Sequence, residues 1–339
     1  MDFKTKSFLT LSGKRGGLLG SEMYLRPEDL HFYEKIVCES RYYPAHADID
    51  NWRDCAKNIS SFIPQSTTAL EYGPGERGVE TKTGAIIKSL NCRNYLAVDK
   101  SRASLESALE SISKIKKDIK AIGIDSDFLC DSMPTTLKRS LAIFSGCSIG
   151  NLETPILQHP PTSALTAALK TLARPVNGGW LLISSDMWLP NKRPEYYVSA
   201  YNSPFHENFN LGVLHRIAEE LKITGFDPTA FFYKPVFHCQ SKAILHLAFS
   251  KRKQAFFFDG VPLSIEKGQP LHLNTSFKFE ENNFVACVNN AGLSVLNLWK
   301  HKKHSMRIYL LQAQACVKHF HASPIVNQDD LTDLKKCYL

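Results

Sequence analysis

The fold of this protein is decided by residues 69–78, which read Ala-Leu-Glu-Tyr-Gly-Pro-Gly-Glu-Arg-Gly. The apolar beginning indicates the end of a buried strand, and the glycines indicate a turn that leads into a helix. Gly73 and Gly75 have no Cβ, so the backbone there can approach a ligand closely. A turn that opens a helix also presents backbone N–H groups to a cofactor. The same pattern occurs in plain strand-to-helix connections, so the segments that follow must decide its meaning.

Strands and helices alternate along the chain around this turn. Short apolar runs predict strands at residues 68–72, 94–98, 121–124, 141–144 and 180–184. Apolar residues at helical spacing predict helices at residues 81–90, 101–115 and 162–172, with Ser101 as the N-cap of the second. This alternation predicts an α/β fold with a parallel sheet and right-handed crossovers.

Polar side chains and glycines follow the predicted strands at the edge where such sheets bind ligands. The residues at these strand ends are Gly73, Gly75, Asp99, Asp127, Asn151 and Asp186. Asp99 comes 26 residues after Gly73, a distance compatible with a carboxylate that accepts hydrogen bonds from a ribose. The sequence therefore predicts a nucleoside-containing cofactor at this edge.

The alternation stops near residue 190 and returns near residue 283, which predicts two lobes. Residues 231–249 and 256–279 contain alternating segments and turns that indicate hairpins, after a helical region at 196–221. We expect a discontinuous, smaller α+β substrate-binding lobe from residues 1–50 and 195–279. The cofactor domain is expected at 51–194 and 280–316, and a C-terminal tail at 317–339. Residues 1–20 are expected to form a flexible lead-in, followed by helices at 27–39 and 49–62.

Composition narrows the class of protein. The chain has 339 residues with a net charge of +8, and its Lys and Arg residues are spread along the chain, so we expect no nucleic-acid partner. The nine cysteines include no Cys-x-x-Cys pair, which argues against a disulfide framework and against a metal site. No stretch has the length of a signal peptide or a membrane span. We therefore expect a cytoplasmic, monomeric protein that acts on a small molecule without contact to membranes.

Three details favour S-adenosylmethionine over a nicotinamide dinucleotide as the cofactor. The turn has Glu71 ahead of the glycines and lacks a well-placed third glycine for a pyrophosphate. Asp127 and Phe128 suit an adenine, because the carboxylate can accept from the exocyclic amine while the ring packs on the base. Predicted strands at 293–299 and 306–312 close the domain as an antiparallel hairpin, which is typical of methyltransferases. A dehydrogenase remains the alternative at this point.

Several short motifs occur together in one order and spacing. They are Tyr42-Tyr43-Pro44, Ser148-Ile149-Gly150-Asn151-Leu152, Ala200-Tyr201 with Phe209-Asn210 and Val213-Leu214, and Ser276-Phe277-Lys278-Phe279. In these motifs the chain resembles the histidine Nα-methyltransferases of ergothioneine biosynthesis and their relatives, which include fungal enzymes that N-methylate a prenylated tryptophan. The resemblance covers about residues 22–314. It implies a Rossmann-like class I methyltransferase sheet with a second, substrate-binding lobe.

The resemblance also implies site residues. For S-adenosylmethionine they are Gly73, Gly75, Lys82, Asp99, Asp127 and Phe128. Asn151 and Tyr201 match a pair that holds the α-carboxylate of the amino acid, and Tyr42, with Tyr24 as a second tyrosine, would have the catalytic role of orienting the amine. Leu245, Asn274 and Ser276 match the pocket for the substrate side chain. The family has Glu at position 274, where it binds the imidazole of histidine, so Asn274 indicates an altered side-chain pocket.

Three further functions are compatible with the sequence. The basic net charge is compatible with methylation of a nucleic acid or a protein, but the motif Asn/Asp-Pro-Pro-aromatic is absent around Pro160-Pro161. An amine that is not an amino acid is another possible methyl acceptor. A catalytically silent S-adenosylmethionine-binding module is the non-enzymatic alternative, although Asn151 and Tyr201 are retained.

Overall fold

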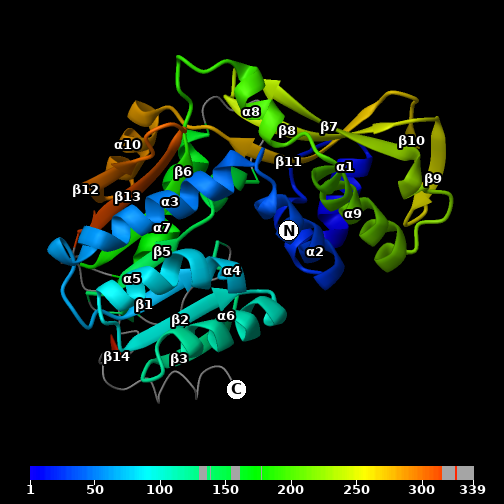
Figure 1. The fold of residues 1–339 in the computed structure, drawn as a ribbon. Helices are drawn as coiled ribbons and strands as arrows, with labels where there is room; N and C mark the ends of the chain where they lie inside the picture. The colour runs from blue at the N-terminus through cyan, green and yellow to red at the C-terminus, as the bar shows by residue number, and fades with distance from the viewer. Residues whose placement is uncertain (130–135, 138, 154–160, 177, 315–324, 327–339) are drawn as a thin grey trace. The chain divides into compact units, whose positions relative to one another are not determined.

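A computed structural model describes residues 1–129, 136–137, 139–153, 161–176, 178–314 and 325–326 (Figure 1). The chain divides into two compact units. Unit 1 comprises Met1–Ala45, Gly150–Pro161 and Trp188–Phe279, and unit 2 comprises His46–Ile149, Thr162–Met187 and Glu280–Leu339. The predicted boundaries differ at three places, because residues 46–50 belong to unit 2 while 150–161 and 188–194 belong to unit 1. Most of the predicted tail at 317–339 lies outside the described residues.

Unit 2 is built on a seven-stranded sheet with the order β12-β13-β6-β5-β1-β2-β3. The strands are β1 (Ala69–Tyr72), β2 (Asn94–Asp99), β3 (Lys120–Asp125), β5 (Leu141–Phe144), β6 (Trp180–Asp186), β12 (Leu293–Lys300) and β13 (Met306–Ala313). Strands β1, β2, β3, β5 and β6 are parallel, whereas β13 runs antiparallel to β6 and to β12. The predicted parallel sheet and its C-terminal antiparallel hairpin are both confirmed. β2 and β3 lie on one side of β1 and β5 and β6 on the other, so the strand order reverses at β1, the topological switch point of the sheet.

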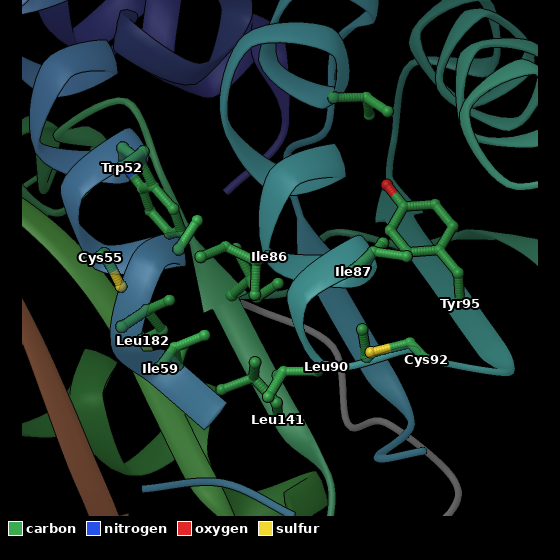
Figure 2. Packing of buried hydrophobic residues seen from close by; sticks show 14 of the residues in the cluster. Trp52, Cys55, Ile59, Ile86, Ile87, Leu90, Cys92, Tyr95, Leu141 and Leu182 are labelled. Carbon is green, nitrogen blue, oxygen red and sulfur yellow. The ribbon is translucent and has the colours of Figure 1, made fainter. Parts of the chain in front are cut away.

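The helices of unit 2 bury apolar side chains against this sheet. They are α3 (Tyr43–Asn58), which begins in unit 1, α4 (Glu76–Gly78), α5 (Gly84–Ser89), α6 (Arg102–Ile115), α7 (Thr162–Ala173) and α10 (Glu281–Asn290), with short 3₁₀ turns at η2 (Ile59–Ser61) and η5 (Arg174–Val176). Figure 2 shows Trp52 and Ile86 among the strand residues Leu141 and Leu182, and all four are fully buried. Ser101 caps α6 by accepting a hydrogen bond from the Ser104 N–H, as its sequence predicts.

Two helices differ from their predicted limits. The predicted helix at 49–62 begins at Tyr43 instead, because Pro44 lies in the first turn, where its missing N–H is not needed. The predicted helix at 81–90 begins at Glu76 and includes a π-helical turn, η3 (Val79–Thr83), between α4 and α5. The hydrophobic pattern does not show that wider turn, which depends on the side-chain contacts described below.

Unit 1 combines a three-stranded antiparallel sheet with helices. The sheet has the order β11-β8-β7, and a separate hairpin pairs β9 with β10. The strands of unit 1 are β7 (Phe231–His238), β8 (Ala243–Ser250), β9 (Gln254–Phe258), β10 (Val261–Ile265) and β11 (Pro270–Phe277). Its helices are α1 (Phe3–Leu11), η1 (Gly20–Tyr24), α2 (Pro27–Cys38), α8 (Pro194–Ala200), α9 (Pro204–Leu221) and η6 (Pro228–Ala230). The predicted hairpins are confirmed.

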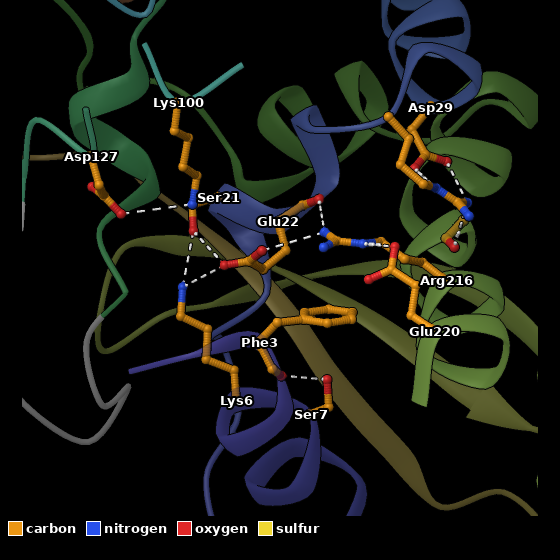
Figure 3. A network of polar contacts seen from close by, with 12 residues as sticks. Phe3, Lys6, Ser7, Ser21, Glu22, Asp29, Lys100, Asp127, Arg216 and Glu220 are labelled. Atoms are coloured by element: carbon orange, nitrogen blue, oxygen red, sulfur yellow. Dashed lines mark hydrogen bonds and ion pairs between the residues drawn. The ribbon is translucent and has the colours of Figure 1, made fainter. Parts of the chain in front are cut away.

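The N-terminal segment is ordered, which contradicts the predicted flexible lead-in. Helix α1 is buried at Lys6 and Leu11, among others. The Lys6 ammonium lies 3.0 Å from Glu22 Oε1 (Figure 3). It also lies 2.9 Å from Glu153 Oε2. Backbone hydrogen bonds also join residues 17–19 to β11. The composition of residues 1–20 predicted a flexible segment, because a lysine is normally expected at the surface. Burial of Lys6 depends on its two carboxylate partners, which the composition does not show.

No helix among the described residues is long and apolar enough to cross a membrane.

Candidate functional site

Backbone hydrogen bonds align the carboxyl ends of β1, β2 and β3 in unit 2. The Gly73 N–H donates to the Val98 carbonyl oxygen at 2.9 Å, and the Ser126 N–H donates to the Asp99 carbonyl oxygen at 3.1 Å. Gly73 has φ +61°, a left-handed conformation that glycine adopts without steric cost. The glycine turn and the segments that follow β2 and β3 therefore meet at one edge of the sheet.

Phe128 lies beside the glycine turn. A Cβ added to Gly73 would be 3.8 Å from the Phe128 ring, which packs with its centroid 5.3 Å from that of Tyr72 and 5.6 Å from that of Phe144. A Cβ added to Gly75 would meet no atom of the described chain within 4 Å. The turn therefore combines a fixed aromatic ring with exposed backbone.

The carboxylate of Asp99 is held at the end of β2. Its Oδ1 accepts a hydrogen bond from the Ser101 N–H at 2.8 Å, and burial raises its pKa to about 6. At neutral pH this side chain is ionised and retains acceptor positions. Asp127, at the end of β3, lies 3.7 Å from the Lys100 ammonium (Figure 3). Both predicted carboxylates are thus placed at the same sheet edge as Gly73.

Asp48 connects Lys82 to the loop after β5. Its Oδ2 accepts from Lys82 Nζ at 3.0 Å and from the Gly146 N–H at 3.2 Å, while its Oδ1 accepts from Trp52 Nε1 at 3.0 Å. Asp48 is 1 % exposed, so its charge is balanced chiefly by Lys82. The role of Lys82 in cofactor binding stays a prediction, and the structure adds an ion pair that sequence analysis missed.

Glu71 supports the helix that follows the turn. Its carboxyl group accepts hydrogen bonds from Thr83 Oγ1 and Tyr95 OH, both at 2.6 Å, and burial raises its pKa. Thr83 lies in the π-helical turn, so this contact fixes η3 against β1 and β2. The acid ahead of the glycines therefore acts within the protein core.

The chemistry of these groups fits S-adenosylmethionine. An ionised Asp99 is suited to accept hydrogen bonds from two ribose hydroxyls, and Phe128 offers an apolar ring surface for a purine. The backbone at Gly73 and Gly75 has no side chain that would block close approach. Among the described residues, no group of three or more His, Cys, Asp or Glu side chains is arranged to hold a metal ion.

Unit 1 contains a cluster of aromatic rings around Tyr201. The Tyr42 ring centroid lies 5.5 Å from that of Tyr201 and 5.2 Å from that of His206, and Tyr201 and His206 are 5.5 Å apart. Burial lowers the pKa of His206 to about 3, so its ring is neutral. Tyr24 packs edge-on against Tyr33, and burial together with the nearby Tyr33 and Tyr201 raises its pKa.

Lys278 reaches the hydroxyl group of Tyr201. Its Nζ donates to the Tyr201 OH at 2.8 Å and lies 4.9 Å from the ring centroid. Lys278 is 2 % exposed, so this cation is buried. An ammonium group can only donate, so the Tyr201 oxygen accepts in this bond and its own O–H proton is not used in it.

Asn151 is joined to β11 through Ser276. The Ser276 hydroxyl donates to Asn151 Oδ1 at 3.0 Å and also lies 3.1 Å from His246 Nε2. Gly150 makes the close approach possible, because a Cβ there would lie 2.9 Å from the Phe277 carbonyl oxygen. The predicted residues Asn151 and Ser276 are therefore brought into direct contact.

The register of β8 and β11 places Leu245 and His246 relative to Asn274. His246 is paired with Asn274, and Leu245 with Thr275, across a bulge between His272 and Asn274. Paired residues project from the same face of a sheet and successive residues alternate. Leu245 therefore lies on the face opposite Asn274, whereas His246 lies on the same face as Asn274. The role of Leu245 in substrate binding stays a prediction. One residue of register moves a side chain to the other face, which short motifs cannot resolve.

Asn274 itself is buried under the N-terminal segment. It is 5 % exposed, and its Oδ1 accepts from the Thr275 N–H at 2.7 Å. A Cβ added to Gly20 would collide with the Asn274 carboxamide. The glycine therefore makes room for this side chain, whose polar atoms are held in one orientation.

Sequence analysis missed His246 and Lys278 as members of this group. Both have a detectable signal, since each is a polar residue flanked by apolar neighbours within a strand pattern, Leu-His-Leu and Phe-Lys-Phe. Tyr42, Asn151, Tyr201, Asn274 and Ser276 belong to unit 1, whereas all six predicted cofactor residues belong to unit 2.

The sequence model of a family described as "Histidine-specific methyltransferase, SAM-dependent" matches residues 27–313. The chain is 29 % identical over 248 residues to "Uncharacterized protein y4iF" of Sinorhizobium fredii, a match that covers 70 % of this chain and 75 % of that protein.

Similar solved structures include two methyltransferases. An S-adenosylmethionine-dependent methyltransferase from Clostridium acetobutylicum is 12 % identical with a TM-score of 0.44, and the match covers 79 % of this chain and 92 % of that one. CalS10, an amino pentose methyltransferase from Micromonospora echinaspora, is 11 % identical with a TM-score of 0.41. The match covers 86 % of this chain and 98 % of that one.

Proposed function

This chain belongs to the family of histidine-specific, S-adenosylmethionine-dependent methyltransferases, and we propose that it methylates the α-amino group of a free amino acid or a close derivative. The observation that carries the proposal is the arrangement in unit 1. There, Asn151 and the Tyr201–Lys278 pair offer hydrogen-bond donors beside neutral aromatic rings. Such donors suit a carboxylate, and such rings suit an amine that becomes a cation.

In unit 2 we assign cofactor binding to the sheet edge at the switch point. Asp99 would accept hydrogen bonds from the ribose hydroxyls, while Asp127 and Phe128 would hold the adenine. The backbone at Gly73 and Gly75 would hold the remainder of the cofactor. When bound, S-adenosylmethionine supplies an electrophilic methyl group on a sulfonium.

In unit 1 the protein positions the amino acid. Asn151 and Tyr201 donate to its α-carboxylate, and the buried Lys278 strengthens the Tyr201 donor because a cation bonded to the oxygen makes the O–H more acidic. Tyr42 and Tyr24 accept or donate at the amine and orient its lone pair. Positioning of this kind can contribute most of the rate enhancement when the nucleophile is already reactive.

The amine needs no strong general base. A free α-amino group has a pKa of about 7.7–8.0, so a substantial fraction is neutral near physiological pH. His206 is neutral and therefore adds no positive charge next to the methylated product. Aromatic faces stabilise an ammonium by about 0.5–2 kcal/mol, which suits a substrate that gains charge.

The side chain of the amino acid is proposed to differ from that of histidine. Asn274 is a neutral group at the position where the resembling family has a carboxylate. A carboxamide can hydrogen-bond an imidazole but supplies no charge for an imidazolium. The proposed acceptor is therefore an amino acid whose side chain carries no positive charge.

Labelled S-adenosylmethionine tests the proposal directly. The protein is incubated with each of the proteinogenic amino acids, with a panel of simple amines and with a cell metabolite extract, and methylated products are identified by mass spectrometry. We expect label on the α-nitrogen of an amino acid. Binding of S-adenosylhomocysteine without turnover of any amino acid or amine would refute the proposed activity.

A further inference from the structure

A continuous chain of hydrogen bonds runs from β7 to Asn151 through the interior of unit 1. Tyr233 OH lies 2.8 Å from His246 Nδ1, His246 Nε2 lies 3.1 Å from Ser276 Oγ, and Ser276 Oγ lies 3.0 Å from Asn151 Oδ1. Tyr233, His246 and Ser276 are each less than 9 % exposed. The chain uses His246, to which neither the sequence motifs nor the proposed reaction assigns a role.

When Ser276 donates in one of its two bonds and accepts in the other, the chain has two possible directions, because a neutral imidazole donates from one nitrogen and accepts at the other. In the first, Tyr233 donates to Nδ1, Nε2–H donates to Ser276, and Ser276 donates to the amide oxygen of Asn151. In the second, every bond is reversed, and the amide nitrogen of Asn151 faces Ser276. In the first alternative the amide nitrogen of Asn151 points away from Ser276, and in the second the amide oxygen does.

Tyr233 decides between them. Its hydroxyl is buried, and among the described residues His246 is its hydrogen-bond partner. In the second alternative the Tyr233 O–H would donate to no described group, and a buried donor without an acceptor is strongly disfavoured. In the first alternative every proton of the chain has an acceptor. Burial and the neighbouring His206, Lys278 and His272 also lower the pKa of His246, which keeps the imidazole neutral.

We propose that His246 is a positioning residue whose Nε2–H, acting through Ser276, holds Asn151 with its amide nitrogen toward the amino acid. Asn151 then offers two N–H donors, which select a carboxylate over a neutral carboxamide. The ring of His246 also lies 5.2 Å from that of Tyr201, so one histidine packs against Tyr201 and reaches Asn151 through Ser276. This inference deepens the proposed function and rests on it for the identity of the ligand.

The tautomer of His246 tests the direction of the chain without any substrate. A long-range ¹H–¹⁵N NMR spectrum of the labelled full-length protein reports which nitrogen of each histidine carries the proton, and His246→Gln assigns the signal. We expect His246 to be protonated on Nε2 across neutral pH. Protonation on Nδ1 overturns the inference whether or not an amino acid is methylated.

Kinetics test the consequence for the ligand. His246→Leu removes the donor to Ser276, whereas His246→Gln keeps an amide N–H near the position of Nε2. For the best amino acid of the panel we expect KM to rise about tenfold in H246L with a smaller change in kcat, and H246Q to stay within about threefold of the parent. The preference for this amino acid over its primary carboxamide should fall about tenfold in H246L.

A double-mutant comparison excludes a general loss of structure. If His246 acts through Asn151, H246L has no further effect on KM once Asn151→Ala is present, because the two changes then remove the same interaction. Additive effects, or an unchanged preference between acid and carboxamide in H246L, overturn the inference. Absence of amino-acid turnover in the parent refutes the proposed function instead, and the NMR result then stands alone.

Discussion

Buried polar side chains with defined partners carry the chemistry at the scale of single residues. Asp99, Asn274 and Lys278 are each partly or fully buried, and each is held by a hydrogen bond from or to a named neighbour. A buried polar group costs free energy unless it is paired, so its partner fixes both its position and its charge. Substitution of such residues therefore has predictable effects on ligand affinity.

Asn274→Glu should raise the affinity for histidine. A carboxylate at this buried position gains a partner when an imidazolium binds, and we expect about tenfold tighter binding, or about 1.4 kcal/mol. Isothermal titration calorimetry with L-histidine and S-adenosylhomocysteine measures it. Asn274→Gln is the control, because glutamine has the length of glutamate without its charge. This variant should show no gain in affinity for histidine. Equal affinities for the two variants would contradict the interpretation of this position.

Cofactor affinity should depend on pH through Asp99. Its pKa is raised by burial from 3.8 to about 6, so the protonated form predominates below that pH and loses acceptor capacity for the ribose. Affinity for S-adenosylhomocysteine should be constant above about pH 7 and fall by up to tenfold per pH unit below about pH 6. Calorimetry from pH 5 to 8 measures this, with Lys100 and Asp125 as the nearby charges that modulate the midpoint.

Asp99→Asn is the control for this pH dependence. The variant should bind more weakly at pH 7.5 and lose the dependence between pH 5 and 7. The raised pKa of Asp99 also makes the stability of the folded chain depend on pH. The folded chain binds this proton more tightly than the unfolded chain, so Asp99 makes the free energy of unfolding rise as pH falls from about 6 to about 4. Equal parent affinities at pH 5 and 7.5 would refute the role of Asp99.

Close backbone contacts position the functional groups at the scale of elements. The 3₁₀ turn η4 (Ser148–Asn151) carries Asn151, and Gly150 lets this turn lie against β11. The bulge in β11 brings Asn274 and Ser276 onto the face of His246. In unit 2 the π-helical turn places Thr83 against Glu71 and Lys82 against Asp48.

Gly150→Ala should disturb amino-acid binding through the backbone alone. The added Cβ would lie 2.9 Å from the Phe277 carbonyl oxygen, so η4 or β11 must shift. We expect a higher KM for the amino acid, unchanged affinity for S-adenosylhomocysteine and a loss of about 1–3 kcal/mol in unfolding free energy. Steady-state kinetics and urea denaturation measure these effects.

Gly78→Ala provides the matched control for that substitution. Gly78 has helical φ and ψ angles, and no atom of the described chain lies within 4 Å of an added Cβ. Alanine there should leave both ligands unaffected and stabilise the chain by about 0.4–1 kcal/mol. A parent-like KM in Gly150→Ala would show that η4 does not need its close approach to β11.

The whole molecule separates the proposed cofactor residues from the proposed amino-acid residues into two units. Ligands should therefore protect different segments from hydrogen exchange, because protection follows the segments that a ligand stabilises. We expect S-adenosylhomocysteine to slow exchange most at residues 69–78 and 94–101. The amino acid should slow it most at 243–250 and 270–279.

Hydrogen–deuterium exchange with mass spectrometry measures the protection that each of the two ligands causes in the same protein. Asn151→Ala is the matched variant, which should lose the protection caused by the amino acid and keep the protection caused by S-adenosylhomocysteine. An amino acid that protects only 69–78 and 94–101 would contradict the division of roles between the units.

Local patterns in the sequence were sufficient for the sheet and for the family. Apolar runs and glycine turns predicted β1, β2, β3, β5 and β6, because strand periodicity and turn chemistry act over a few residues. The resemblance in short motifs is confirmed by the family match over residues 27–313. Asp99 and Asp127 could be predicted to lie at one edge of the sheet, because the carboxyl ends of parallel strands meet there.

Tertiary structure alone decided the partners of these residues. Three features depend on contacts between residues far apart in the sequence: the helix at residues 3–11, the ion pair of Lys82 with Asp48, and the pairing of His246 with Asn274. Strand register and burial are set by the packing of whole elements, and a shift of one residue reverses the face of a side chain. For that reason the sequence determined which cofactor this protein uses, while only the fold showed which histidine is linked to Asn151 through Ser276.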